Sequence, residues 1–159
     1  MFSTTLPTPI GQLTIEATET DVCFIGFRDE LPEKITNAIT DQAAKQILEY
    51  FQGERHAFDF PIAQTGTDFQ QKVWAKLLEI PAGKPISYAA LSKMMDNPLA
   101  IRAIAAANGK NNLMIVVPCH RVIGSNGDLV GYAGGLWRKK WLLEHEAKML
   151  GIGQAVLAF

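Results

Sequence analysis

Cysteine and histidine are scarce in this chain, and their spacing argues against several classes of protein. The 159 residues contain two cysteines, Cys23 and Cys119, and three histidines. The cysteines are far apart, so the disulfide framework of a small secreted domain is not expected, and a reducing, cytoplasmic location is the default. No close pair of cysteines or histidines has the spacing of zinc ligands, so the sequence predicts no metal site.

Long apolar runs are also missing. No segment is long enough to span a bilayer, and the first residues lack the basic and then apolar pattern of a secretory signal. No internal repeat or low-complexity segment is present. No glycine-rich dinucleotide fingerprint follows a strand pattern, so no cofactor is predicted. The chain is 48% hydrophobic and 19% charged, which is typical of a globular protein with one or two cores.

The net charge of −1 conceals an asymmetry between the two parts of the chain. Residues 1–62 carry four Lys/Arg against ten Asp/Glu, whereas residues 63–159 carry eleven against six. A basic part is what a polyanion-binding surface requires. An excess of five positive charges is modest, and such imbalance is common, so this observation supports nucleic-acid binding only weakly.

Hydrophobic periodicity in the first part predicts strands and one helix. Apolar and polar residues alternate over 11–18, and an apolar run over 22–27 suits a buried strand with Cys23 as a small core residue. A helical pattern opens at Pro32 and stops near residue 53. Residues 56–60 return to alternation and predict a further strand.

The second part is predicted to be mainly helical. Thr67 and Gln70 form a capping box that starts a helix after a boundary near residue 64. The apolar positions of that helix are Phe69, Val73 and Leu77. A last helix carries Trp137, Trp141, Leu142, His145 and Glu146.

Two short helices between them match a helix-turn-helix. Ser87 can cap the first, which runs through Met95. Asn97 and Pro98 are predicted to start the second, which is rich in alanine and stops near residues 108–109. Small side chains let a helix lie close either to a neighbouring element or to a DNA groove, and the pattern alone favours tight internal packing.

Cys119 has the surroundings of a possible nucleophile. A predicted strand over residues 115–117 leads into Pro118 and Cys119, with His120 and Arg121 next. A cysteine reacts as the thiolate, so it needs neighbours that lower its pKa or accept its proton. Glu146 could orient His120 in a nucleophile, base and carboxylate arrangement. A turn over 125–128 and a glycine-rich loop over 131–135 follow.

Several segments in unbroken order over about residues 64–148 carry a family resemblance. They are residues 65–74, 80–83, 87–88, 102–103, 111, 118–122, 131–135 and 140–146. Together they strongly resemble the O6-alkylguanine-DNA alkyltransferases, the methylated-DNA–protein-cysteine methyltransferases of the ogt type. The resemblance implies an α+β protein. A ribonuclease-H-like α/β domain over residues 1–63 would precede a mainly helical winged-helix, or helix-turn-helix, DNA-binding domain over residues 64–159.

The resemblance also implies roles for single residues. Cys119 matches the alkyl acceptor, His120 the residue that relays its proton through a water molecule, and Glu146 the carboxylate that orients the histidine. Asn111 matches an asparagine that braces the active-site turn. Tyr88 matches the tyrosine whose hydroxyl bonds the flipped base and stabilises charge on the leaving guanine.

Other residues match the groups that hold the substrate. Arg102 matches the arginine finger that fills the gap left in the base stack. Tyr132 and Ala133 lie on the lid loop over the alkylated base. The backbone carbonyl of Val122, with that of the acceptor cysteine, would accept from the guanine amino group, and Arg121 is grouped with these binding residues.

The implied reaction is a single, irreversible transfer of an alkyl group from O6 of guanine, and from O4 of thymine, onto Cys119. The partner would be double-stranded DNA that contains the lesion. The protein would act as a monomer and would not associate with a membrane. Zinc-bearing members have extra Cys and His in the first domain, which Cys23 alone cannot reproduce. Position 133 is Ala where some members have Ser, which bears on the size of alkyl group accepted.

Three other functions fit parts of the pattern. An alkyltransferase-like protein binds lesions without transfer, but that class lacks the acceptor cysteine that is present here. A helix-turn-helix regulator would perform no chemistry. A cysteine hydrolase would use Cys119 and His120, yet adjacent residues at a strand end usually point apart.

Overall fold

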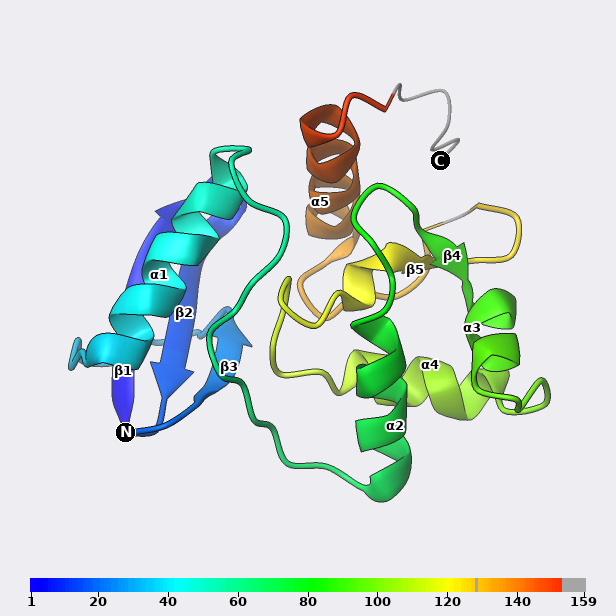
Figure 1. Ribbon diagram of the computed structural model, residues 1–159, viewed down its shortest axis with the longest axis horizontal. Helices are drawn as coiled ribbons and strands as arrows, with labels where there is room; N and C mark the ends of the chain where they lie inside the picture. Colours follow the sequence, from blue (N-terminus) through cyan, green and yellow to red (C-terminus); the bar gives the residue numbers. More distant parts are fainter. Residues whose placement is uncertain (128, 153–159) are drawn as a thin grey trace. The chain divides into compact units, whose positions relative to one another are not determined.

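The computed structural model describes residues 1–127 and 129–152, which group into two compact units (Figure 1). The first unit contains Met1–Gln64 together with Asn112–Val116, and the second contains Thr65–Asn111 and the chain from Val117 onward. No helix within the described ranges has the length and apolar character needed to cross a membrane.

The first unit is a three-stranded antiparallel sheet with one helix packed on it (Figure 1). Its strands, in the order β1-β2-β3, are β1 (Phe2–Thr8), β2 (Gly11–Ala17) and β3 (Val22–Gly26), and its helix is α1 (Ala38–Phe51). The core between sheet and helix consists of side chains with almost no exposed surface: Ile10, Leu13, Ile15, Val22, Ile25, Ala43, Ile47 and Tyr50.

The predicted strands over 11–18 and 22–27 are confirmed, but the start of the helix is wrong. Pro32 does not open α1, because Ile35 is used by the sheet: its backbone exchanges two hydrogen bonds with Ser3, of 2.8 and 3.0 Å. The helix begins after Asn37, whose side chain forms a capping box with Thr40.

The strand predicted over residues 56–60 is also wrong. Only Ile62, further along, makes a bridge to Val22. The alternation in this stretch has another cause: the Phe58 ring packs on Tyr50 of α1 and on Phe60, with centroid distances of 5.8 and 5.9 Å. Aromatic packing against a helix therefore produces the same period as a strand.

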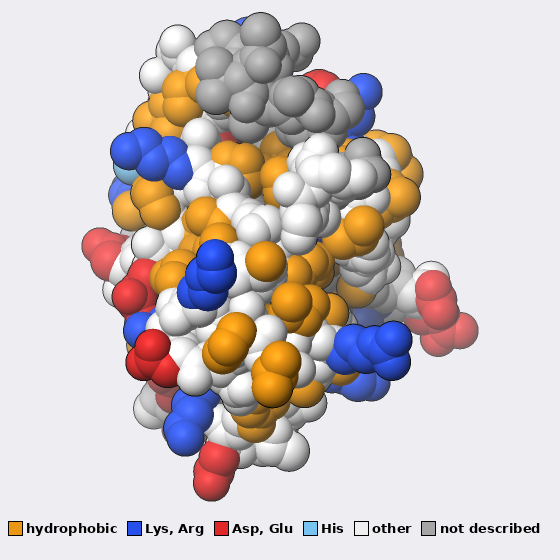
Figure 2. Space-filling model, turned by 90° about the vertical axis from the view of Figure 1, so that its right-hand side faces the viewer, with side chains coloured by type: hydrophobic (Ala, Val, Ile, Leu, Met, Phe, Trp, Pro, Cys, Tyr) orange, Lys and Arg blue, Asp and Glu red, His pale blue; other side chains and the backbone are white. Residues whose placement is uncertain are grey.

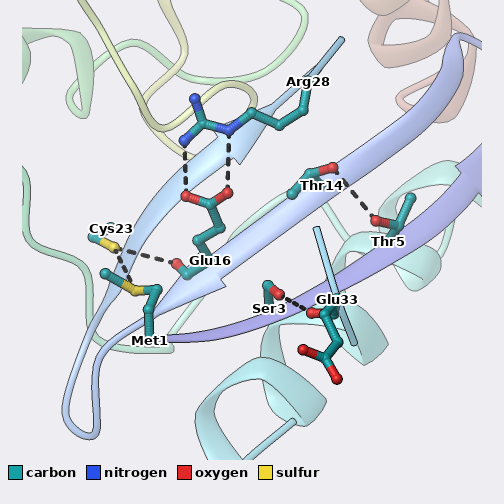
Figure 3. Close-up of polar contacts among 8 residues, drawn as sticks. All are labelled: Met1, Ser3, Thr5, Thr14, Glu16, Cys23, Arg28 and Glu33. Carbon is teal, nitrogen blue, oxygen red and sulfur yellow. Dashed lines mark hydrogen bonds and ion pairs between the residues drawn. The ribbon is translucent and has the colours of Figure 1, made fainter. Parts of the chain in front are cut away.

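Polar contacts on the strands of the first unit are shown in Figure 3. The Arg28 guanidinium donates to both carboxylate oxygens of Glu16, at 2.7 and 3.1 Å, and lies over the Phe24 ring. Cys23 is half-buried, with its thiol against the Glu16 carbonyl and the Met1 sulfur. Burial raises the pKa of this thiol, which accords with an unreactive residue.

The second unit consists of four α-helices and two short strands in its described part. They are α2 (Asp68–Leu77), β4 (Ile86–Ser87), α3 (Tyr88–Met94), α4 (Ile101–Gly109), β5 (Val122–Ile123) and α5 (Leu136–Met149). The Thr67–Gln70 capping box and the Ser87 cap are confirmed. In α2, Val73 and Leu77 are buried, while Phe69 is half-buried.

The helix-turn-helix pair is present, but Asn97 does not cap α4. Asp96 has a left-handed φ of 53°, and the Asn97 N–H bonds back to the Ser92 carbonyl, so both residues complete the C-terminal cap of α3. The helix α4 therefore starts three residues later, after Ala100, which provides no side-chain cap.

The segment between α4 and the cysteine is not the predicted strand. Leu113 alone bridges to Ile25, and Ile115 has a φ of 75°, a conformation that a β-branched residue rarely adopts. The Val116 N–H bonds to the Met114 carbonyl across Ile115, which is the pattern of a γ-turn. In the turn predicted over 125–128, the Gly127 N–H bonds to the Gly124 carbonyl, and residue 128 lies outside the described residues.

Candidate active site

A tight turn at Pro118 positions Cys119 within the second unit. Pro118 has φ −82° and ψ 63°, and the Cys119 N–H bonds to the Val117 carbonyl at 2.8 Å. These values define an inverse γ-turn, which the fixed φ of proline favours. Cys119 then begins a short 3-10 helix, Cys119–Arg121, so the predicted geometry of a strand end is replaced by a helical turn.

The Cys119 thiol is buried and hydrogen-bonded. Asn111 donates from Nδ2 to Cys119 Sγ at 3.3 Å and to the Val117 carbonyl at 2.9 Å, so it spans the turn that presents the thiol. Burial raises the pKa of the Cys119 thiol, while the Asn111 hydrogen bond and the positive charge of Lys139 oppose the rise. The resting residue is therefore a protonated thiol that needs a base before it can attack.

His120 and Glu146 form a fully buried pair. Their Nε2 and Oε2 atoms lie 2.7 Å apart, and neither side chain has exposed surface. Arg121 donates from Nε and Nη2 to the two oxygens of the same carboxylate, both at 2.9 Å, and from Nη1 to the Ile80 carbonyl at 2.7 Å. Arg121 thus has internal partners in place of the DNA contact that the sequence suggested.

Charge distribution decides which atom of His120 carries the proton. Although burial raises the pKa of Glu146, its bonds to His120 and Arg121 hold that pKa well below the ordinary value, so the carboxylate is ionised. Burial lowers the pKa of His120, so its ring is neutral. An ionised carboxylate only accepts, so Nε2 carries the hydrogen and Nδ1 carries a lone pair. Nδ1 is buried without a hydrogen-bond partner among the described residues, which makes it a free base.

Tyr88 is tied to the cysteine segment through the backbone and through Asn108. Strands β4 and β5 pair in parallel, with Ser87 opposite Ile123, so the start of α3 is fixed beside the residues that follow the 3-10 helix. Asn108 Nδ2 donates to the Tyr88 hydroxyl at 3.1 Å and to the Cys119 carbonyl at 3.3 Å. Because the hydroxyl accepts this bond, its own hydrogen remains available to donate to a ligand.

Asn108 and Lys139 are two members of this cluster that sequence reasoning missed. The sequence indicates Asn108 only as part of the end of a helix. Lys139 has no exposed surface, and its ammonium group donates to the carbonyls of Val130 and Gly131 at 2.7 and 3.3 Å. Burial lowers the pKa of Lys139 to about 8, against the attraction of Cys119. Its only sequence signal is a lysine on the helix that follows a glycine-rich loop.

The loop over residues 130–135 presents both buried and exposed groups. The Tyr132 hydroxyl is buried with no hydrogen-bond partner within residues 1–127 and 129–152, and burial raises its pKa well above the ordinary value. Ala133 is exposed, and the Gly135 N–H closes a turn onto the Tyr132 carbonyl at 2.9 Å. Val122 is buried at the start of β5.

Arg102 lies on the solvent-exposed side of α4, one residue after the helix begins. The helix α4 is held to α2 by a hydrogen bond, in which the Trp74 indole donates to the Ala107 carbonyl at 2.9 Å. Internal packing accounts for Ala107, which is buried where α4 packs on α2, while Ala103 and Ala106 are exposed.

No group of three or more His, Cys, Asp or Glu in the described chain is placed to hold a metal ion. The polar cluster instead consists of one thiol, one neutral imidazole, one ionised carboxylate and two buried cations. These features define a helix-turn-helix protein with a buried cysteine set in a polar network.

Comparisons with known proteins identify the family. The model of the 6-O-methylguanine DNA methyltransferase DNA-binding domain matches residues 68–148, and that of its ribonuclease-like domain matches residues 1–64. A methylated-DNA–protein-cysteine methyltransferase from Shigella flexneri is 46% identical over 127 residues, which cover 79% of this chain and 74% of that protein. One from Methanosarcina acetivorans is 39% identical over 153 residues, covering 92% and 98%.

A solved structure supports the same assignment. The crystal structure of Mycobacterium tuberculosis OGT in complex with DNA has a TM-score of 0.86 to this protein at 36% identity, and the match covers 100% of both chains. The chain belongs to the 6-O-methylguanine DNA methyltransferase family. The resemblance noted in the sequence and the α+β fold that it implied are both confirmed.

Proposed function

We propose that this protein repairs DNA by moving an alkyl group from O6 of guanine, and from O4 of thymine, to Cys119. The observation that carries the proposal is the buried thiol held by Asn111 in the same unit as the His120–Glu146 pair and the helix-turn-helix. Its expected partner is double-stranded DNA that contains the alkylated base. No step of this chemistry calls for a cofactor.

The reaction needs a base, a nucleophile and a leaving group. The Cys119 proton passes to His120 Nδ1 through a water molecule, and the ionised Glu146 stabilises the resulting imidazolium. Cys119 Sγ then attacks the alkyl carbon in line with the bond to O6. That bond breaks, and its electron pair stays on the guanine, where the free hydrogen of the Tyr88 hydroxyl meets the developing charge.

Base flipping gives the thiol access to an atom inside a duplex. Extrusion of the nucleotide costs about a few kcal/mol. Arg102 fills the gap, the backbone carbonyls of Cys119 and Val122 accept from the guanine amino group, and Tyr132 and Ala133 cover the base. The Tyr132 hydroxyl, which has no described partner, is available to such a ligand.

The product is a thioether, which has no good leaving group, so the protein is consumed after one transfer. The test is a titration with a duplex that contains one O6-methylguanine, followed by peptide mapping. One methyl per chain, located on the peptide that contains Cys119, supports the proposal. More than one repaired guanine per chain, or a methyl elsewhere, overturns it.

Lys139 has a role in this scheme that can be tested by removing its charge. We expect Lys139→Met to slow transfer roughly ten- to a hundredfold, because the lid carbonyls lose a charged donor and Cys119 loses a nearby positive charge. Single-turnover rates measure the effect. Lys140→Met is the matched control, since Lys140 is the adjacent residue, is exposed and pairs only weakly with Glu144 at 3.8 Å.

The same lysine predicts a pH dependence. The pKa of Lys139, about 8, lies below the ordinary 10.5, so the folded protein loses this proton at a lower pH than the unfolded chain does. The cost of burying the ammonium is therefore complete below about pH 8 and disappears as the pH rises toward 10.5. Above pH 8 the loss of charge should lower the rate of transfer, against the rise from thiol ionisation. Lys139→Met should lack this decline, and an identical profile in the variant would remove Lys139 from the scheme.

Arg102 should matter only when the substrate is a duplex. We expect Arg102→Ala to slow transfer from an O6-methylguanine duplex by about tenfold or more, because nothing then fills the gap in the base stack. Transfer from a free alkylated guanine leaves no gap, so its rate should hold. Arg55→Ala, which changes an arginine of the first unit, is the control. Equal losses on both substrates would contradict the finger role.

Two further expectations complete the proposal. The residues assigned to the reaction all lie in the second unit, so no residue of a second copy is needed, and the protein should act as a monomer, which sedimentation of the DNA complex can check. The acceptor must remain reduced until it meets DNA, which favours the cytoplasm as its location.

A further inference from the structure

Leu99 is a large apolar side chain with 97% of its surface exposed, the highest value among the large hydrophobic residues in the described chain. Single exposed leucines are ordinary. This one stands in a hydrogen-bonded turn at the start of α4: the Ala100 N–H bonds to the Asn97 carbonyl at 3.1 Å, and the Ile104 N–H bonds to the Ala100 carbonyl at 2.9 Å. The backbone therefore holds Leu99 in solvent rather than leaving it free to fold back.

Leu99 lies in register with the exposed side of α4. Residues three and four apart share one side of a helix, and the turn over 97–100 leads directly into the first turn of α4. The series Leu99, Arg102, Ala103, Ala106 and Lys110 has that spacing, and every member is exposed. Ala103 and Ala106 make the middle of this stripe smooth, so Leu99 and Arg102 are the large side chains at its first turn.

The charge around this stripe suits a polyanion such as DNA. From residue 97 to residue 127 the sequence has no Asp or Glu, and its exposed cations are Arg102 and Lys110, since Arg121 is buried against Glu146. Figure 2 looks onto the side of the molecule where α3 lies, and hydrophobic side chains gather across it among separate Lys and Arg side chains, with Asp and Glu near its edges. An apolar surface bordered by cations matches the faces of bases bordered by phosphates.

We propose that Leu99 is a wedge that packs against the base stack next to the flipped nucleotide, on the side opposite to the gap that Arg102 fills. This inference rests on the proposed function. Flipping exposes the apolar face of a neighbouring base, and an aliphatic side chain covers such a face, whereas it gains nothing from a phosphate. The wedge adds an apolar contribution to opening the duplex, beside the cationic contribution of the finger.

The experiment compares Leu99→Ala and Leu99→Met with the wild type. Leu31→Ala is the matched control, because Leu31 is 55% exposed and lies in the first unit. The substrate is a duplex in which 2-aminopurine, a fluorescent base that brightens when unstacked, flanks one O6-methylguanine. A second substrate, free O6-benzylguanine, reaches Cys119 without a duplex.

We expect Leu99→Ala to lose roughly tenfold in transfer from the duplex and to unstack 2-aminopurine less. Leu99→Met keeps an apolar side chain and should stay near the wild type, as should Leu31→Ala. Equal duplex rates for Leu99→Ala and the wild type overturn the wedge, and so does an equal loss on both substrates. A variant that alters only self-association in sedimentation assigns the surface to protein contact and overturns it too. If the wild type transfers nothing from either substrate, the proposed function itself fails.

Discussion

The Cys119→Ser variant should bind alkylated duplex as the wild type does while its alkyl transfer falls by roughly a thousandfold or more. Serine keeps the shape and a partner for Asn111, but its hydroxyl is far less acidic than a thiol. The neutral His120 is too weak a base to ionise it. Electrophoretic mobility measures the binding, and intact mass measures the transfer.

Cys23→Ser is the matched control for this experiment, since Cys23 is the other cysteine of the chain and lies on a strand of the first unit. It should transfer at the full rate. A methylated product in Cys119→Ser, or a loss of transfer in Cys23→Ser, would show that the acceptor has been assigned to the wrong residue.

Glu146→Gln should affect both stability and rate. The carboxylate accepts one bond from His120 and two from Arg121 without any exposed surface, so its neutral replacement leaves a buried guanidinium without a counter-charge. Breaking such a pair costs about 3–5 kcal/mol of unfolding free energy. Transfer should slow because the imidazolium loses its stabilising charge.

Urea unfolding and single-turnover transfer separate the two effects when both are measured below the unfolding transition. Glu144→Gln is the matched control, because Glu144 lies on the same helix with a partly exposed side chain. It should change neither quantity. A Glu146→Gln protein of normal stability and normal rate would remove the carboxylate from both the fold and the mechanism.

Local signals predicted most of the helices. The Thr67–Gln70 capping box and the Ser87 cap each start a helix at the expected residue, because a cap acts through its own neighbours. The errors arise where a residue has a distant partner. Ile35, which the prediction includes in the helix opened by Pro32, bonds to Ser3 in the sheet, and Asn97, the expected cap of the second helix, bonds to the end of the preceding one.

The active site divides in the same way. The motif around Cys119 and the pattern of the final helix predict that His120 meets Glu146, and the two side chains are in contact at 2.7 Å. Lys139 cannot be predicted in the same way, because a lysine in a helix is normally solvated, and only the fold shows that its ammonium is buried and bonded to two loop carbonyls. Arg121 was expected at the DNA for the converse reason, since a sequence does not reveal that a guanidinium is enclosed.

The path of the chain through Asn112–Val116 has a consequence for the inheritance of this protein. This segment belongs to the first unit, yet it separates Asn111 from Cys119, which share a hydrogen bond in the second. A gene fusion or deletion at residue 64 would therefore not yield two self-contained modules. The first product would lack Leu113, the bridge partner of Ile25. The second would carry residues 112–116 without the sheet beside which they lie. Selection should therefore retain the genes in which the two units remain together.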